Sequence, residues 1–282
     1  MGYLEPTLAA MRAARSADSP APRWSEAEAL AWLTAMPGDF TIQRAAMVAA
    51  IGARLGRHAG KLGPAALARA LTAMAEVRRE CFVCPLGDDL AYLPAPLAIG
   101  ADQIMSHPEL VALLAAAADP QGGDVLDIGT GSGYQAAVLA RMARQVQSIE
   151  IIAPLARLAA RRLAREGFDN VRVEAGDAAL AQLPAERFDA IVVAAGAARV
   201  PRALLGALRP GGRLVMPIGP NSDRELLTRI VRRRESGFSI TRFGPVRFVP
   251  LTGAGARRTA GQARALSSAI ISASPTTSAY LA

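Results

Sequence analysis

The chain has 282 residues, of which 51% are hydrophobic and 20% charged, so it can bury a sizeable core in one large domain or two small ones. Its net charge of +8 comes almost entirely from arginine, since Lys61 is the only lysine, and it would suit anionic partners as well as solvated helix faces. No stretch approaches the roughly 18 apolar residues of a membrane span, and the N-terminus has no apolar run of the signal-peptide type, so we expect a cytoplasmic protein without membrane contact.

The first part of the chain is predicted to be mostly helical. Residues 1–24 are rich in Ala, Pro and Ser and should form little regular structure. A capping box at residues 25–28 predicts a short helix after it. The spacing of apolar residues predicts helix over residues 44–79, with a break at 60–64, whereas irregular Pro and Gly predict a loop over residues 85–100.

Strands and helices alternate from residue 124 onward, which favours right-handed crossovers and a mostly parallel, doubly wound sheet. We expect strands at 124–128, 146–149, 171–175, 189–195 and 213–219, helices at 135–143, 154–166 and 201–208, and a turn at 209–212. Residues 226–233 and 238–251 predict a strand pair at the end of the sheet, with at least one member antiparallel. The last thirty residues should form a flexible tail.

Two cysteines, Cys81 and Cys84, form a C-x-x-C motif that would suit a redox pair or half of a zinc site. The chain has only two histidines, His58 and His107, and no second cysteine pair. A zinc site with four protein ligands is therefore hard to build. We expect two ordinary reduced cysteines and no metal.

The segment VLDIGTGSGYQAA at residues 125–137 places three glycines at alternate positions after a predicted strand. In a doubly wound sheet, such a loop lies where ligands bind. The Walker A pattern is excluded because no lysine follows, and the spacing G-x-G-x-G differs from the G-x-G-x-x-G of dinucleotide-binding loops. The remaining interpretation is S-adenosylmethionine (SAM), which has no phosphate and needs only the close approach of backbone that glycine permits.

Carboxylates at the ends of predicted strands support SAM. Glu150 ends the second strand of the alternating region, where it can accept hydrogen bonds from both ribose hydroxyls, although this position also suits NAD. Asp177 follows the third strand, where it can meet the adenine amino group, and Asp127 lies beneath the glycine loop, which it can orient. Glu150 and Asp177 could each be surface or capping residues, but the ordered combination of the glycine loop and these carboxylates is far more specific than either residue alone.

Five segments resemble the protein-L-isoaspartate O-methyltransferase family: AMAEVRRECFV (73–83), DLAYLPAPLAIG (89–100), VLDIGTGSGYQAAVLA (125–140), ALRPGGRLVMPIG (207–219) and VRFVPL (246–251). The resemblance implies an α/β fold, with the doubly wound, mostly parallel seven-stranded sheet of the Rossmann-like SAM-dependent methyltransferases and an N-terminal helical extension. It also implies methylation of the free carboxylate of L-isoaspartyl residues in damaged proteins or peptides. The ester then closes spontaneously to a succinimide, whose hydrolysis returns some normal aspartate.

The substrate loop of this family resembles I-G-x-G-Q-T-I-S, and here it is IGADQIMS at residues 99–106. Gly100, Gln103 and Ser106 match, while Asp102 replaces a glycine and Ile104 a threonine. Ser106 corresponds to the active-site hydroxyl, although Ser-x-Pro also fits a cap for a helix that starts at residue 108. The resulting substrate-side prediction comprises Gly100, Asp102, Gln103, Ile104, Ala194 and Ala195, with Ser106 as the catalytic residue. The cofactor-side prediction comprises Asp127, Gly129, Thr130, Gly131, Ser132, Gly133, Glu150, Asp177 and Ala178.

No general base is expected, because a carboxylate with a pKa near ~4 is already ionised at pH 7. Catalysis should come mainly from holding the acceptor oxygen, the methyl carbon and the sulfur in line, which can contribute roughly 7–11 kcal/mol. The partners expected are isoaspartyl proteins or peptides, bound by a monomer.

Three alternatives remain open. The altered loop would suit a dedicated peptide carboxyl methyltransferase, or a SAM-binding relative that has lost catalysis. A nucleic-acid methyltransferase is disfavoured, because the AAGAA that follows the fourth strand at residues 194–198 replaces the Pro-Pro-aromatic element of amino-directed enzymes. We predict an extension at 1–43, a methyltransferase domain at 44–252, divided at 123/124 into a helical and substrate-loop part and a cofactor-binding sheet, and a tail at 253–282.

Overall fold

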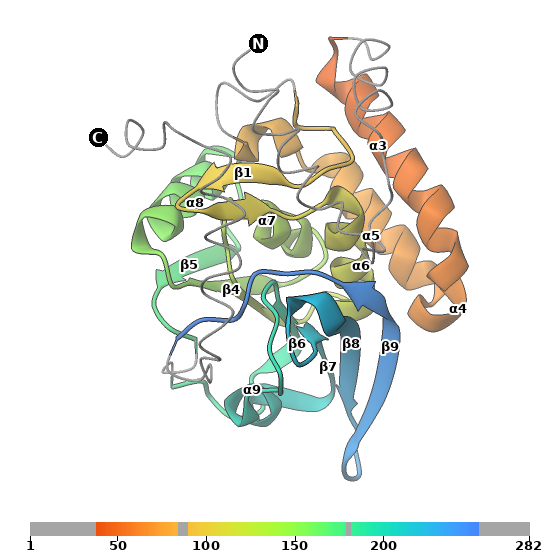
Figure 1. The fold of residues 1–282 in the computed structure, drawn as a ribbon, viewed down its shortest axis with the longest axis vertical. Coiled ribbons are helices and arrows are strands. Elements are labelled where there is room, and N and C mark those ends of the chain that lie inside the picture. The colour runs from red at the N-terminus through yellow and green to blue at the C-terminus, as the bar shows by residue number, and fades with distance from the viewer. Residues whose placement is uncertain (1–37, 84–89, 179–181, 254–282) are drawn as a thin grey trace.

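The computed structural model describes residues 38–83, 90–178 and 182–253. A seven-stranded sheet lies at its centre, between layers of helices (Figure 1). The helix predicted after residue 28, nearly all of the predicted C-terminal tail, and Cys84 lie outside the described residues.

The sheet confirms the predicted doubly wound fold. Its strands are β3 (Asp124–Ile128), β4 (Gln145–Glu150), β5 (Val171–Ala175), β6 (Phe188–Val193), β7 (Leu208–Ile218), β8 (Glu225–Arg232) and β9 (Phe238–Val246). They lie in the order β5-β4-β3-β6-β7-β8-β9. Strands β3 to β7 are parallel, and β8 is antiparallel to both β7 and β9, as expected for the end of the sheet.

The helices of the described residues include those predicted from the apolar spacing. They are α3 (Phe40–Leu55), α4 (Ala59–Leu62), α5 (Pro64–Glu76), α6 (Pro108–Ala118), α7 (Tyr134–Ala140), α8 (Ala153–Arg165) and α9 (Arg202–Ala207). Gly63, whose φ of +89° favours glycine, separates α4 from α5 and accounts for the predicted break. Helix α7 ends at Ala140, earlier than the sequence predicted.

Both faces of the sheet are apolar, as expected for parallel strands that are covered on both sides. Along β3, Val125 belongs to the core formed with α6 and α7, whereas the next residue, Leu126, belongs to the core on the α9 side. The first core continues outward through α5 to α3. Successive side chains of β3 therefore pack against helices on opposite faces of the sheet. This packing holds the strand, and with it the strand end that leads into the glycine loop, in a fixed position.

Two segments differ from the sequence prediction. Residues 97–105, of which the first part was predicted to be loop, form the antiparallel hairpin of β1 (Leu97–Gly100) and β2 (Gln103–Met105). The turn predicted at 209–212 is instead part of β7, where the pairing with β6 shifts register and Gly211 has a φ of +85°. Residues 209–212 stand opposite Asp189 alone in this pairing, so the chain loops out there and then continues along β6 in the same direction.

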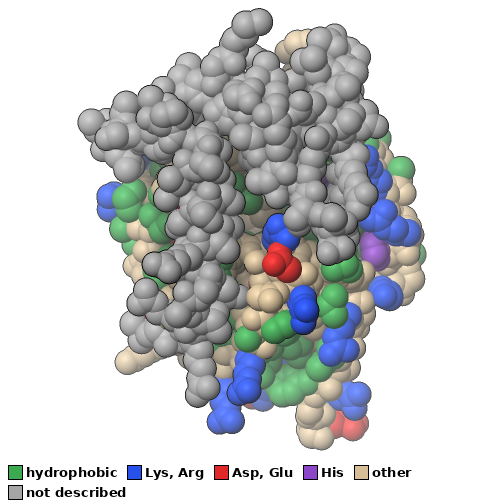
Figure 2. All heavy atoms as spheres, viewed as in Figure 1, with side chains coloured by type: hydrophobic (Ala, Val, Ile, Leu, Met, Phe, Trp, Pro, Cys, Tyr) green, Lys and Arg blue, Asp and Glu red, His purple; other side chains and the backbone are tan. Residues whose placement is uncertain are grey.

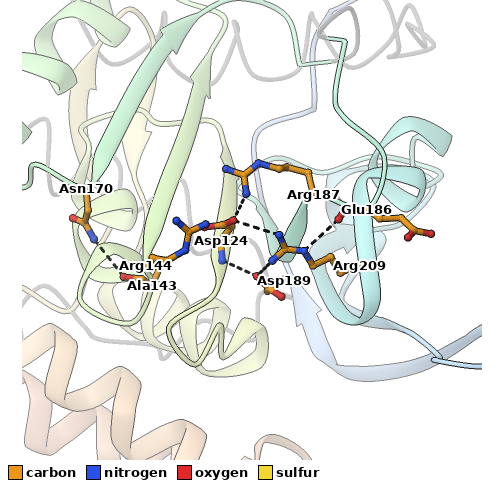
Figure 3. Close-up of polar contacts among 8 residues, drawn as sticks. All are labelled: Asp124, Ala143, Arg144, Asn170, Glu186, Arg187, Asp189 and Arg209. Carbon is orange, nitrogen blue, oxygen red and sulfur yellow. Dashed lines mark hydrogen bonds and ion pairs between the residues drawn. The ribbon is translucent and has the colours of Figure 1, made fainter.

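A cluster of charged residues joins the N-terminal ends of the central strands, as Figure 3 shows. Asp124, at the start of β3, is 1% exposed and pairs with Arg144, Arg187 and Arg209. Its backbone N–H donates to Asp189 of β6 at 2.8 Å, and Arg209 pairs with Asp189 at 2.5 Å. These contacts tie β3 to β6 at the end of the sheet away from the glycine loop.

The face drawn in Figure 2 shows several Lys and Arg side chains of the described residues, with Asp or Glu side chains beside two of them. No helix within the described ranges combines the length and apolar composition that crossing a membrane requires.

Candidate functional site

A cavity of about 430 Å³ lies at the C-terminal ends of β3, β4, β5 and β6. Its wall is built from the hairpin of β1 and β2, the glycine loop after β3, the end of β4, the segments after β5 and β6, and residues 249–252. These parts are distant in sequence, and the parallel sheet brings them to one edge. This edge is where doubly wound sheets bind ligands.

The glycine loop has the backbone conformation that its three glycines permit. Gly129, Gly131 and Gly133 have φ values of +89°, +54° and +95°. A Cβ on Gly131 would lie 3.2 Å from Cδ1 of Ile99, on the hairpin above the loop. Gly129 and Gly131 line the cavity, together with Thr130 and Ser132.

Gly133 lies outside the cavity wall. A Cβ at this position would come within 3.4 Å of Ala159 and Leu163 of α8. The third glycine therefore allows the start of α7 to approach α8 closely. It supports the loop from behind, whereas the sequence analysis placed it among the cofactor contacts.

The carboxylate of Glu150 lies at the wall of the cavity and is tied to the backbone around it. Its Oε2 accepts a hydrogen bond from the N–H of Gly131 at 2.8 Å, and its Oε1 accepts one from the N–H of Ile152 at 2.9 Å. The residue is only 5% exposed. Each oxygen keeps a second acceptor position, so the carboxylate can also take two hydroxyl hydrogen bonds.

Asp177 and Ala178 line the cavity beyond β5, as the sequence predicted. The backbone of Gly253 approaches the Asp177 carboxylate so closely that a Cβ at position 253 would overlap it. Asp177 therefore lies where the chain returns across the cavity mouth.

Asp127 lies beneath the loop and outside the cavity wall. It is completely buried, and its Oδ2 accepts a 2.7 Å hydrogen bond from the hydroxyl of Ser148, which lies 2.5 Å from the hydroxyl of Thr130. Burial raises the pKa of Asp127 to about 7; the Ser148 hydrogen bond opposes this shift and the charge of Glu150 adds to it. Asp127 thus reaches the loop through Ser148, which the sequence analysis missed.

The substrate-side residues lie on the hairpin. Gly100 ends β1, and Ala101 and Asp102 form the turn; their φ values are +90°, +52° and +55°. Asp102, Gln103 and Ile104 line the cavity, and Asp102 and Ile104 are exposed at its mouth. Gly100 does not line it and serves the turn instead. Asp102 keeps the left-handed conformation that a glycine would adopt, which aspartate tolerates better than most residues.

Ser106 lines the cavity at the end of the hairpin, just before α6. The cap of α6 is His107, whose Nδ1 accepts from the N–H of Glu109 at 3.1 Å, so the alternative of Ser106 as the cap is wrong. Burial lowers the pKa of His107 to about 3. His107 is thus a neutral structural residue. Ser106 does not cap the helix and lines the cavity instead.

Ala194 and Ala195 line the cavity after β6, and the next residue joins them to the C-terminal segment. The N–H of Gly196 donates to Val249 at 2.8 Å, and the N–H of Leu251 donates to Gly196 at 2.7 Å. A Cβ on Gly196 would overlap the carboxylate of Glu225, which accepts from the N–H of Phe248 at 3.1 Å.

Burial raises the pKa of Glu225 to about 7. The Glu225 carboxylate packs against Gly196, next to Ala194 and Ala195, and so supports this part of the cavity wall. Nothing in the sequence indicated this role, because the contacts of Glu225 are with residues distant in the chain.

The cavity fits SAM. Positive-φ glycines leave space along the loop, Glu150 can accept from the ribose, and Asp177 offers a carboxylate further along the same wall. Among the described residues, no group of three or more His, Cys, Asp or Glu could hold a metal ion. The thiol of Cys81 is free, and burial raises its pKa to about 11, which keeps it unreactive at neutral pH.

Comparison with known families gives a match to the model of the protein-L-isoaspartate(D-aspartate) O-methyltransferase family over residues 59–256. A protein-L-isoaspartate O-methyltransferase of Rhodopseudomonas palustris is 48% identical over 187 residues, which cover 66% of this chain and 86% of the relative. One from Syntrophobacter fumaroxidans is 44% identical over 214 residues, covering 74% of this chain and 86% of the relative.

Two solved structures share the fold. One is described as a protein-L-isoaspartate O-methyltransferase and is 25% identical, with a TM-score of 0.60, covering 73% of this chain and 66% of its own. The other, from Plasmodium falciparum, is in complex with S-adenosyl-L-homocysteine and is 23% identical, with a TM-score of 0.58, covering 72% of this chain and 97% of its own.

Proposed function

The chain belongs to the protein-L-isoaspartate(D-aspartate) O-methyltransferase family, and we propose that it uses SAM to methylate the free carboxylate of L-isoaspartyl residues in damaged proteins and peptides. The observation that carries this proposal is the meeting, in one cavity, of the Glu150-anchored glycine loop and the Ser106 hairpin. The first suits the cofactor and the second the acceptor.

On the cofactor side, Gly129, Thr130, Gly131 and Ser132 provide the backbone wall, with Glu150 for the ribose and Asp177 with Ala178 for the adenine end. Bound SAM supplies a methyl group on a sulfonium, which is already activated for transfer. Asp127 lies too deep to touch a ligand. Its part is to hold Thr130 in place through Ser148.

On the acceptor side, the Ser106 hydroxyl donates a hydrogen bond that positions the acceptor oxygen, while Asp102, Gln103 and Ile104 form the rim that meets the peptide. Ala194 and Ala195 line the same cavity, next to the glycine loop. An isoaspartyl carboxylate is ionised at pH 7, so no group of this chain needs to remove a proton. The residues act by holding the reacting atoms in line, which can lower the barrier by roughly 7–11 kcal/mol.

Repair follows from the product. The backbone nitrogen next to the methyl ester displaces methanol and closes a succinimide, and water opens it to aspartyl and isoaspartyl forms. We also propose that the enzyme works as a monomer in the cytoplasm; both statements remain predictions, as do the domain limits at residues 44 and 252.

The decisive experiment measures methyl transfer from SAM to an isoaspartyl peptide and to its aspartyl counterpart. Turnover of the isoaspartyl peptide alone supports the proposal. If neither peptide is methylated although SAM binds, the chain is either a dedicated peptide methyltransferase or a SAM-binding relative without catalysis, and a screen of other peptide acceptors separates those two.

A further inference from the structure

Arg79 is a completely buried arginine next to the cavity (0% exposed). Its Nε donates to the carbonyl of Ala91 at 2.7 Å, and its Nη2 donates to the carbonyl of Ser106 at 3.1 Å. The guanidinium carbon lies 4.6 Å from the centre of the Tyr134 ring. Ser106 and Tyr134 both line the cavity, so this cation lies directly behind its wall.

The charge of Arg79 has no counter-ion among the described residues. Its Nη1 also finds no hydrogen-bond partner there, and the guanidinium lies against the carbonyls of Ala91 and Ser106 and the ring of Tyr134. The nearby His107 is neutral because burial lowers its pKa to about 3, so it contributes no charge. A buried ion that lacks a partner is costly, because water no longer solvates it.

An anion that enters the cavity beside Ser106 would offset this cost. Attraction between opposite charges is stronger in a poorly solvated interior than in water. Arg79 therefore attracts a negatively charged acceptor to the substrate end of the cavity, and this attraction opposes the repulsion from the Asp102 carboxylate at the cavity mouth.

We propose that Arg79 is a positioning residue for the acceptor carboxylate: it fixes the backbone of Ser106 and supplies the positive charge that selects an anionic acceptor over a neutral one. This inference rests on the proposed function and extends it, because it assigns acceptor selectivity to a side chain that does not line the cavity. Ser106 orients the acceptor oxygen, and Arg79 makes the place beside Ser106 attractive to it.

The test compares two peptides in the presence of S-adenosyl-L-homocysteine: one with an isoaspartyl carboxylate and one with the same linkage but a neutral amide in place of the carboxylate. Wild type should bind the carboxylate peptide about tenfold more tightly than the amide peptide, as expected for a contact with a charged partner. Arg79→Gln keeps a hydrogen-bond donor and removes the charge, so this preference should fall to near one, whereas Arg79→Lys should keep most of it.

The control is Arg162→Gln. Arg162 is also a buried arginine and donates to the carbonyl of Val83 at 2.7 Å, but on α8 and away from the cavity wall. This variant should keep the preference for the carboxylate peptide. Calorimetry with S-adenosyl-L-homocysteine alone should give equal affinity for wild type and Arg79→Gln, since the cation lies on the acceptor side.

Two results would overturn the inference alone: a wild-type enzyme that methylates the isoaspartyl peptide but binds the carboxylate and amide peptides equally, or an Arg79→Gln variant that weakens both peptides by the same factor. The first can be read from wild type even if the variant does not fold. A wild type that neither binds nor methylates the isoaspartyl peptide would instead overturn the proposed function, and this inference with it.

Discussion

The backbone N–H of Gly131 donates a 2.8 Å hydrogen bond to Oε2 of Glu150, which joins the middle of the glycine loop to the end of β4. The other oxygen of the same carboxylate accepts from the N–H of Ile152, just before α8. One side chain therefore holds two backbone segments in place around the cavity and also lines it.

Replacing Glu150 by alanine should weaken SAM binding at least tenfold. The variant loses hydrogen bonds from the ribose, worth about 1.5–3 kcal/mol each when one partner is charged, and it also releases Gly131. Titration calorimetry measures the change. Glu174→Ala is the matched control, because this carboxylate lies on the neighbouring β5 and does not line the cavity. Unchanged affinity in Glu150→Ala would remove Glu150 from the cofactor site.

Replacing Gly131 by valine should abolish SAM binding while the protein stays folded. The new side chain would enter the cavity wall, where even a Cβ lies 3.2 Å from Ile99. Gly167→Val is the control: its φ of +75° imposes a comparable backbone strain, but a Cβ there meets nothing within 4 Å. Circular dichroism checks folding and calorimetry checks binding. Normal binding by Gly131→Val would mean that the loop does not touch the cofactor.

Restoring glycine at position 102 and threonine at 104 should raise kcat/KM on a generic isoaspartyl peptide. The change removes a carboxylate at the cavity mouth that repels the acceptor, and it adds a hydroxyl in place of the 42% exposed Ile104. Ser106→Ala should lower kcat/KM, and SAM affinity should barely change in either variant. Steady-state kinetics on one peptide decides. If the wild type already turns over the peptide rapidly and the double variant shows no higher kcat/KM, Asp102 does not disturb the acceptor.

The unfolding free energy should fall as the pH rises through the pKa of Asp127. This pKa is about 7 in the folded protein and 3.8 for an ordinary aspartate, so the folded state binds the proton more tightly. This contribution to the unfolding free energy is fully present below pH 3.8. Between pH 3.8 and about pH 7 it decreases by about 1.4 kcal/mol per pH unit.

Asp127→Asn should remove this share of the pH dependence. Urea unfolding between pH 5 and 8 measures it. Glu225, whose pKa is also raised to about 7, should contribute in the same direction and persist in the variant. A wild-type slope identical to that of Asp127→Asn would show that the buried carboxyl is not protonated in this range.

Replacing Asp124 by asparagine should lower the unfolding free energy by roughly 1–3 kcal/mol, because the buried carboxylate loses its ion pairs with three arginines. Asp223→Asn is the control, because its carboxylate is 64% exposed and a surface pair contributes little. Denaturant unfolding compares the two, with SAM affinity expected to be unchanged in both. Equal stability of Asp124→Asn and wild type would contradict a structural role for the cluster.

The sequence predicted the alternating strands and helices because their apolar periods are set locally. The hairpin of β1 and β2 escaped prediction because its two strands are only four and three residues long and lie among prolines and glycines. The four residues 209–212 were predicted as a turn, and in the structure they stand opposite the single residue Asp189 of β6, so the chain loops out there before β7 continues.

Residues at or just after the end of a strand, such as Glu150 and Asp177, could be assigned to the cavity because parallel strands end at one edge. The supporting side chains could not. The partners of these side chains are brought close only by folding, as for Arg79, Ser148 and Glu225. No local sequence pattern distinguishes a side chain that packs behind the cavity wall from one that lines the cavity.

The charged cluster and the cavity lie at opposite ends of β3, whose five residues span roughly 16 Å. Substitutions at the two ends share no partners, so their effects on free energy should add. A variant stabilised around Asp124 would thus be a suitable background for engineering the hairpin. Its added stability would offset the destabilisation caused by a new acceptor loop, and the distance between the two sites would leave acceptor binding unchanged.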